Sequence, residues 1–298
     1  MKRTSSFYLL LLTLIAFTGC WEKDEFKEGD VISFAPKAEE VVSRASFINS
    51  TADLNHFIVW GNYDGNVVFA GQRVERVDQQ WEYSPLQKWI LSADQYDFSA
   101  FTPADAGIPV IVENRLTSID VDCSISQRDL VMAYTTVPKA KIGQAVLMNF
   151  NHALAAVNFS FKLKEGFSYS NSYKIVNVKW DNIHSQGRFT LNKDNTISAQ
   201  LLGNADESIA PTGITGTTLS AASAIESEYL FVVPQSLSNA SLIITIEING
   251  VTSEISKSLA VDWKAGQRYT YNVSIDPFEI SVETTPWETP KVNDLIIQ

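Results

Sequence analysis

Apolar and polar residues alternate along much of this chain, a pattern typical of half-buried β-strands. Residues 155–163 place four apolar side chains on one face, at Val157, Phe159, Phe161 and Leu163. Residues 241–248 and 268–275 show the same two-residue period, and no long helical period occurs anywhere in the chain. Short strands with frequent turns predict a β-sandwich architecture rather than alternating strands and helices.

Turn residues separate these strands. Asn249-Gly250 follows one alternating run directly and is the strongest short signal for a two-residue hairpin. Asp64-Gly65 and Lys193-Asp194-Asn195 predict two further hairpin turns. Ala205–Ser227 is rich in Ser, Thr, Ala and Gly, and we expect a long loop there.

The amino end carries an export signal. Lys2 and Arg3 precede an apolar run, Phe7–Phe17, that is shorter than the roughly 20 residues a membrane-spanning helix needs. Gly19-Cys20 resembles a bacterial lipobox, in which the cysteine is acylated and becomes the first residue of the mature chain, although Phe17 stands where that pattern usually has Leu. Several acyl chains on Cys20 would anchor the protein stably. The alternative is an ordinary cleaved signal in which Cys20 is incidental.

Composition narrows the choice of partners. The net charge is −11, and removal of residues 1–19 would take away Lys2 and Arg3 alone, leaving −13. A chain this acidic repels phosphate backbones, so we expect no nucleic-acid partner. Only Cys123 remains besides Cys20, which excludes an internal disulfide in the mature chain, and we expect it to be a small buried strand residue. The roughly 280 mature residues suit two domains, with a boundary near 145 after the polar connector Thr135–Gly143.

An ordered series of short motifs runs through residues 57–287. It comprises Phe57–Tyr63 (FIVWGNY), Trp81-Glu82-Tyr83, Trp89, Tyr96–Pro103 (YDFSAFTP), Asp129–Ala133 (DLVMA), Val146–Leu154 (VLMNFNHAL), Gly187-Arg188-Phe189, Val233-Pro234-Gln235 and Trp263–Tyr271 (WKAGQRYTY). In order and spacing this series resembles the fimbrillin family. The resemblance implies an all-β fold of two transthyretin-like β-sandwich domains in tandem, and a role like that of the shaft, anchor and tip subunits of type V pili.

The resemblance also implies how the chain is processed and assembled. Fimbrillin precursors are cleaved outside the cell by a trypsin-like protease after an arginine placed like Arg44, so the mature chain would begin at Ala45. Residues 31–44 contain enough apolar side chains to form an edge strand, and its removal would expose a groove. The carboxy end of the next subunit would fill that groove by strand addition, with donor residues Phe278, Ile280, Val282 and Trp287. Repetition of this contact yields an open filament.

These expectations divide the chain into four parts. They are a signal peptide over 1–19, a lipidated tether with a removable strand over 20–44, and β-sandwich domains over 45–145 and 146–298. The acidic tether Trp21–Glu25 resembles a signal for the outer face of the cell in Bacteroidales-type bacteria. We therefore expect the protein in the outer membrane, exposed at the surface, and in the fimbrium if it is processed. Its expected partners are other pilus subunits, the membrane through Cys20, and the processing protease.

The sequence predicts that this protein is not an enzyme. The three histidines, His56, His152 and His184, lie in no hydrolase or metalloprotease motif, and no glycine-rich phosphate loop occurs, so we expect no cofactor and no metal. His152 lies between apolar strand residues and is expected to be a hydrogen-bonded core histidine. Two alternatives remain open: an uncleaved anchor subunit, and a surface lipoprotein that binds glycans on an exposed Trp60, Trp180 or Trp287.

Overall fold

The structure is a computed structural model of the 298-residue chain. It describes residues 31–38, 48, 50–165, 170–205, 207–275 and 280–286. Within these residues almost every element is a β-strand, and the two helices are single 3₁₀ turns, η1 (Thr51–Asp53) and η2 (Lys139–Lys141). None of the helices in the described ranges is long and apolar enough to cross a membrane.

The largest sheet, here called the large sheet, has seven strands in the order β1-β9-β8-β5-β2-β3-β4. Its strands are β1 (Phe34–Ala38), β2 (His56–Tyr63), β3 (Asn66–Val77), β4 (Gln80–Glu82), β5 (Gln95–Thr102), β8 (Val131–Pro138) and β9 (Val146–His152). A four-stranded sheet in the order β13-β12-β7-β6 covers one of its faces. That sheet contains β6 (Ile108–Val112), β7 (Arg115–Asp122), β12 (Gln186–Leu191) and β13 (Ile197–Leu202).

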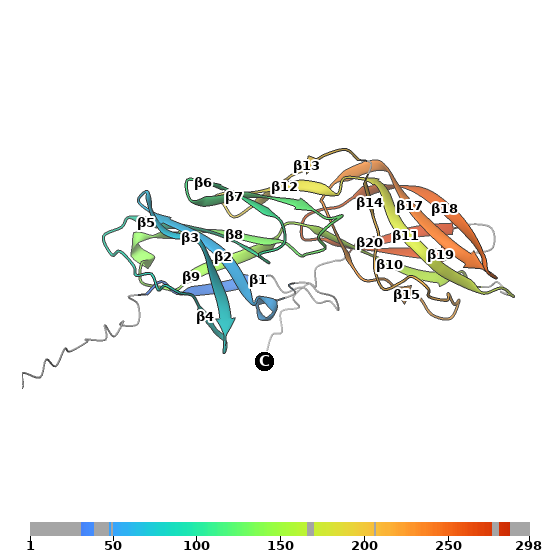
Figure 1. Ribbon diagram of the computed structural model, residues 1–298, viewed down its shortest axis with the longest axis horizontal. Helices are drawn as coiled ribbons and strands as arrows, with labels where there is room; N and C mark the ends of the chain where they lie inside the picture. The colour runs from blue at the N-terminus through green and yellow to red at the C-terminus, as the bar shows by residue number, and fades with distance from the viewer. Residues whose placement is uncertain are drawn as a thin grey trace, which may run out of the picture.

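Two further sheets form the other end of the molecule (Figure 1). One has the order β15-β10-β19-β20, with β16 also paired to β10, and the other has the order β14-β11-β17-β18. Their strands are β10 (Ala155–Leu163), β11 (Tyr173–Ile183), β14 (Glu207–Ile209), β15 (Ile225–Glu226), β16 (Leu230–Val232), β17 (Ser236–Ile248), β18 (Val251–Asp262), β19 (Arg268–Ile275) and β20 (Ile280–Pro286). Trp180 packs between the two sheets, with its ring 5.8 Å from that of Phe159 and 4.9 Å from that of Tyr271.

The predicted all-β sandwich fold is confirmed, and several local predictions agree with it. Residues 155–163 and 268–275 form β10 and β19 with the predicted limits, because alternating apolar residues fit a sheet with one buried face. Asn249-Gly250 joins β17 to β18 with backbone φ angles of 50° and 83°. Asp64-Gly65 joins β2 to β3 in the same way, at 45° and 80°. These left-handed conformations are those that two-residue hairpin turns require.

Strand pairing continues across the predicted boundary near residue 145. β9 follows that boundary in the sequence but belongs to the large sheet, next to β8. The β12–β13 hairpin also returns to the first half, where β12 pairs with β7 from Gln186 opposite Asp122 to Thr190 opposite Ser118 (Figure 1). Only Ala153 and Leu154 separate β9 from β10. The division into domains over 45–145 and 146–298 stays a prediction.

Asn195, at the tip of the β12–β13 hairpin, joins β8 to β9. The two strands pair directly at Val131 and Met132. Beyond that point the Asn195 amide bridges them: its Oδ1 accepts from the backbone N–H of Tyr134 (2.7 Å), and its Nδ2 donates to the carbonyl of Asn149 (2.9 Å). One side chain of the β12–β13 hairpin therefore helps to hold β9 within the large sheet.

Candidate functional site

Strand β1 lies at one edge of the large sheet and pairs with β9 alone among the described strands. The two strands run parallel, from Phe34 opposite Val146 to Ala38 opposite Phe150. The Val146 N–H donates to the carbonyl of Ser33 (2.8 Å). Pro36 suits this position because an edge strand tolerates a residue without an N–H. β1 is thus a short edge strand with backbone contacts to one neighbouring strand.

Phe34 anchors β1 through its side chain. It is 6% exposed and lies in a ring of four aromatic side chains, here called the aromatic cage. The centroid distances from the Phe34 ring are 5.4 Å to Phe57, 5.5 Å to Phe69, 5.9 Å to Phe98 and 6.0 Å to Tyr83. Three of these contacts are edge-to-face, the geometry that aromatic quadrupoles favour. Removing β1 would open a groove lined by these four rings.

The loop over residues 83–91 closes the groove on the side away from β9. The Ile32 N–H donates to the carbonyl of Gln87 (2.9 Å), and the Tyr83 hydroxyl donates to the carbonyl of Ile32 (2.7 Å). Burial raises the pKa of Tyr83 above its ordinary value, so its hydroxyl keeps the proton it donates. An isolated bridge pairs Val31 with Lys88. The chain just before β1 is therefore held by this loop as well as by the large sheet.

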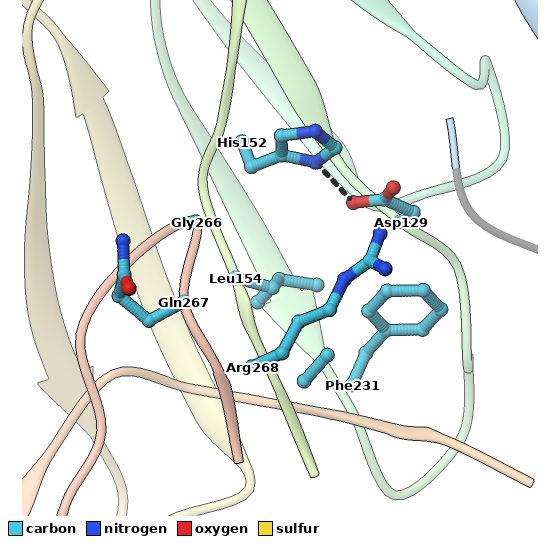
Figure 2. A pocket seen from close by; sticks show the side chains of 8 residues that line it. Asp129, His152, Leu154, Phe231, Gly266, Gln267 and Arg268 are labelled. Atoms are coloured by element: carbon cyan, nitrogen blue, oxygen red, sulfur yellow. Dashed lines mark hydrogen bonds and ion pairs between the residues drawn. The ribbon is translucent and has the colours of Figure 1, made fainter. Parts of the chain in front are cut away.

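Ala38 and Ile48, the residues on either side of segment 39–47, are each held by a hydrogen bond. The Ala38 N–H donates to Thr51 Oγ1 (3.2 Å), and the Ile48 N–H donates to Asp129 Oδ2 (3.0 Å). The other carboxylate oxygen of Asp129 lies 2.9 Å from His152 Nδ1 (Figure 2). The side chains of Asp129 and His152 are 4% and 8% exposed, so this contact is buried. A cut between Ala38 and Ile48 would separate β1 from the rest of the chain without removing either of these hydrogen-bonding groups.

Asp129 and His152 also line a small pocket between the two ends of the molecule. Figure 2 shows the Arg268 guanidinium extending toward Asp129 past Phe231, with Gly266 and Gln267 on the opposite wall. The pocket has room for about 10 Å³, roughly one water molecule. Burial lowers the pKa of Arg268 below its ordinary value. The small volume and the buried partners indicate a structural joint, and His152 is the hydrogen-bonded core histidine that its sequence context predicts.

Several predicted site residues lie outside the described residues: Cys20, Arg44, Ala45, Phe278 and Trp287. The predicted donor residues Ile280 and Val282 belong to β20, where they pair with Ile275 and Val273 of β19. Val282 is half-buried and packs against the core. In this structure β20 is therefore a strand of its own chain, antiparallel to β19.

The remaining candidate residues are structural. Trp60 and Trp180 are buried, 9% and 0% exposed, so neither forms the solvent-facing platform that glycan binding would require. Cys123 is fully buried, which raises the pKa of its thiol to about 12 and makes it inert. Within the described ranges, no group of three or more His, Cys, Asp or Glu side chains is placed to hold a metal ion.

Sequence reasoning missed the residues that hold β1 and its flanks. Tyr83, Asp129 and Asn195 make their contacts with residues 51, 81 and 61 positions away, respectively. No local pattern encodes such contacts. The available signal for β1 itself was an apolar residue at every second position, at Ile32, Phe34, Pro36 and Ala38.

The comparisons with known proteins agree on one architecture. The family model described as fimbrillin-like matches residues 24–287. A fimbrial protein from Bacteroides vulgatus superposes with a TM-score of 0.56 at 15% identity, covering 87% of this chain and 99% of that chain. A candidate cell adhesion protein from Bacteroides ovatus superposes at 0.58 with 14% identity, covering 88% and 99%. At these identities the structural likeness shows the fold alone. A comparison with curated protein sequences finds no match.

Proposed function

Because this chain belongs to the fimbrillin-like family, we propose that it is a subunit of a cell-surface pilus, assembled by exchange of strand β1 for a strand of a neighbouring subunit. The similar fimbrial protein from Bacteroides vulgatus supports this role through its shared fold. The role is structural, and the chain contributes to adhesion as part of the pilus. No chemical step is assigned to its own side chains.

One observation supports the proposal: β1 is a short edge strand that pairs with β9 and places Phe34 in the aromatic cage, so its removal would expose both. It contributes five residues to the large sheet and pairs with β9 alone among the described strands. Without it, β9 would present unpaired backbone groups beside the open aromatic cage, and such an edge binds another strand readily.

Cleavage after Arg44 is the proposed trigger. Arg44 lies in segment 39–47, between the two fixed flanks Ala38 and Ile48. Cleavage there would turn β1 from part of a continuous chain into a separate peptide. Its replacement would then no longer require the rest of the fold to open.

The carboxy end supplies the proposed donor for the next subunit. Phe278, Ile280 and Val282 recur at every second position of the sequence, and Trp287 comes directly after Pro286, the last residue of β20. A donor and an acceptor on different surfaces of each subunit make a heterologous contact that, repeated from subunit to subunit, builds a filament. Before cleavage, acylated Cys20 would hold the precursor at the outer membrane, exposed at the cell surface.

The test is the amino-terminal sequence and SDS resistance of material sheared from cells that make the protein. We expect chains that start at Ala45 and run as ladders. Arg44→Ala should abolish both, while Arg73→Ala, which changes an exposed arginine paired with Glu75, should behave as wild type. Wild-type chains that start at acylated Cys20 and run as monomers would contradict processing and leave the uncleaved anchor.

A further inference from the structure

We propose that the aromatic cage selects the strand that replaces β1, and that this strand comes from a different subunit rather than from a second copy of this chain. The incoming strand needs an aromatic side chain where Phe34 lies, an apolar one two residues earlier, and small ones two and four residues later. This inference rests on the proposed function, since it takes β1 to be replaceable.

The requirement for an aromatic side chain follows from the contacts of Phe34. The planes of Phe57, Tyr83 and Phe98 stand at 82°, 69° and 87° to the Phe34 plane. An edge-to-face ring gains energy beyond the area it buries, and an aliphatic side chain of similar size does not. The cage therefore discriminates a ring from leucine as well as from a small residue.

The requirement for small side chains follows from the two inward positions after Phe34. Pro36 lies opposite Met148, and Ala38 lies opposite Phe150. Both are buried, and the Ala38 backbone also binds Thr51. Because protein interiors are close-packed, branched side chains at these two positions would need room that the groove does not provide.

Backbone contacts on both sides determine the register. Ser33 accepts from Val146 on the β9 side, and Ile32 contacts Gln87 and Tyr83 on the loop side. A slip by one residue would turn every inward side chain outward. An incoming strand that lacks an aromatic side chain at the Phe34 position therefore cannot place one in the cage by a one-residue shift.

The carboxy end of this chain does not meet these requirements. If Phe278 took the place of Phe34, Asp276 would replace Ile32, and the branched residues Ile280 and Val282 would replace Pro36 and Ala38. If Trp287 took that place instead, the polar Thr285 would replace Ile32. The groove therefore favours a donor strand of different sequence, as in a pilus built from more than one kind of subunit.

The experiment measures peptide binding to the full chain, cut at a sequence-specific protease site introduced within residues 41–46. A fluorescent peptide of residues 31–38 is bound in the vacated groove, and unlabelled peptides compete with it. Phe34→Ala should weaken competition on the order of 1,000-fold and Phe34→Leu on the order of tenfold. Lys37→Ala is the matched control, because Lys37 is exposed, and should compete within about twofold of wild type.

A peptide of residues 276–291, which includes Phe278 and Trp287, tests the choice of partner, and it should compete on the order of 100-fold more weakly than residues 31–38. Equal competition by the native peptide and the Phe34→Leu peptide would overturn selection by the cage. Equal competition by the 276–291 peptide would overturn the assignment to a different subunit. If no peptide enters and the cut β1 stays bound, the proposed strand exchange itself fails, and the inference fails with it.

Discussion

The two edge strands nearest the chain ends, β1 and β20, are held in different ways. β1 has five residues and relies on the aromatic cage around Phe34. β20 has seven residues and pairs with β19 along its whole length, from Ile280 opposite Ile275 to Pro286 opposite Tyr269. Of its side chains whose surroundings are described, Val282 is half-buried and Thr284 is exposed.

This difference separates two kinds of edge. A strand held mainly by its side chains can be replaced by any strand that brings the right side chains, and its specificity lies in the groove. The ladder between β20 and β19 uses backbone groups, which carry little sequence information by themselves. We therefore propose that the acceptor site lies at the β1 edge, and predict that changes in the cage affect β1 far more than Val282→Ala affects β20.

The largest effect is expected from Phe34→Ala. Loss of a buried ring leaves a cavity in the cage and should cost about 3–5 kcal/mol of the free energy that keeps β1 in place. Val282→Ala, the matched change in β20, should cost about 1 kcal/mol because its side chain is only half-buried. Denaturant unfolding measures both costs, with amide hydrogen exchange at Val146 reporting on β1 and exchange at the β19 amides that face β20 reporting on β20. Equal costs for the two variants would remove the distinction between the edges.

A smaller effect is expected from Asn195→Ala. The variant loses the amide that bridges Tyr134 and Asn149, so β9 should loosen and destabilise β1 by about 1–3 kcal/mol. Asn192→Ala on the same hairpin is the control, since its half-buried side chain donates within the hairpin, to Thr196 and Ser198. Faster exchange at Val146 with unchanged exchange along β19 is the expected result. Loss of protection at both strands would mean that Asn195 supports the whole fold.

Tyr83→Phe should act on β1 alone. It removes the hydroxyl that donates to Ile32 and keeps the ring in the cage, so we expect a loss of about 1 kcal/mol. The β1 peptide should dissociate several-fold faster from the cut variant, and β20 should be unaffected. An unchanged dissociation rate would show that the Tyr83 hydroxyl does not help to hold the strand.

The smallest effect concerns Asp120 and Arg188, which join β7 to β12 away from both edges. The Arg188 guanidinium donates two hydrogen bonds of 2.6 Å to Asp120 and holds the pKa of that carboxyl below its ordinary value. The ionised form therefore stabilises the fold at neutral pH, and this contribution is lost as the pH falls through the lowered pKa. Asp120→Asn should lower the melting temperature slightly at pH 7, and this difference should shrink as the pH falls below the ordinary range of an Asp carboxyl. A constant difference as the pH falls would exclude the ion pair as its cause.

Much of the fold could be predicted because it is encoded by local patterns. The alternation in β10 and β19 and the Asn249-Gly250 turn each lie within a few residues of sequence. The return of β12 to β7 could not be predicted, because an alternating strand does not specify which sheet it joins. The same limit applies to the candidate site. An apolar stretch before Arg44 indicates an edge strand, but the cage around Phe34 arises from β2, β3, β5 and loop 83–91 together.

The most direct test is amide hydrogen exchange at the two edge strands after the chain has been cut between Ala38 and Ile48. The cut protein is measured alone, with an excess of native β1 peptide, and with an excess of β1 peptide carrying Phe34→Ala. Val146 reports on β1 because its N–H donates to Ser33, and the amides of Tyr269–Ile275 report on the β19–β20 pair. We predict that cutting and washing expose Val146, that only the native peptide restores its protection, and that β19 stays protected throughout. Protection of Val146 that no longer depends on β1, or equal restoration by both peptides, would contradict the central claim that the β1 edge is a side-chain-selective acceptor.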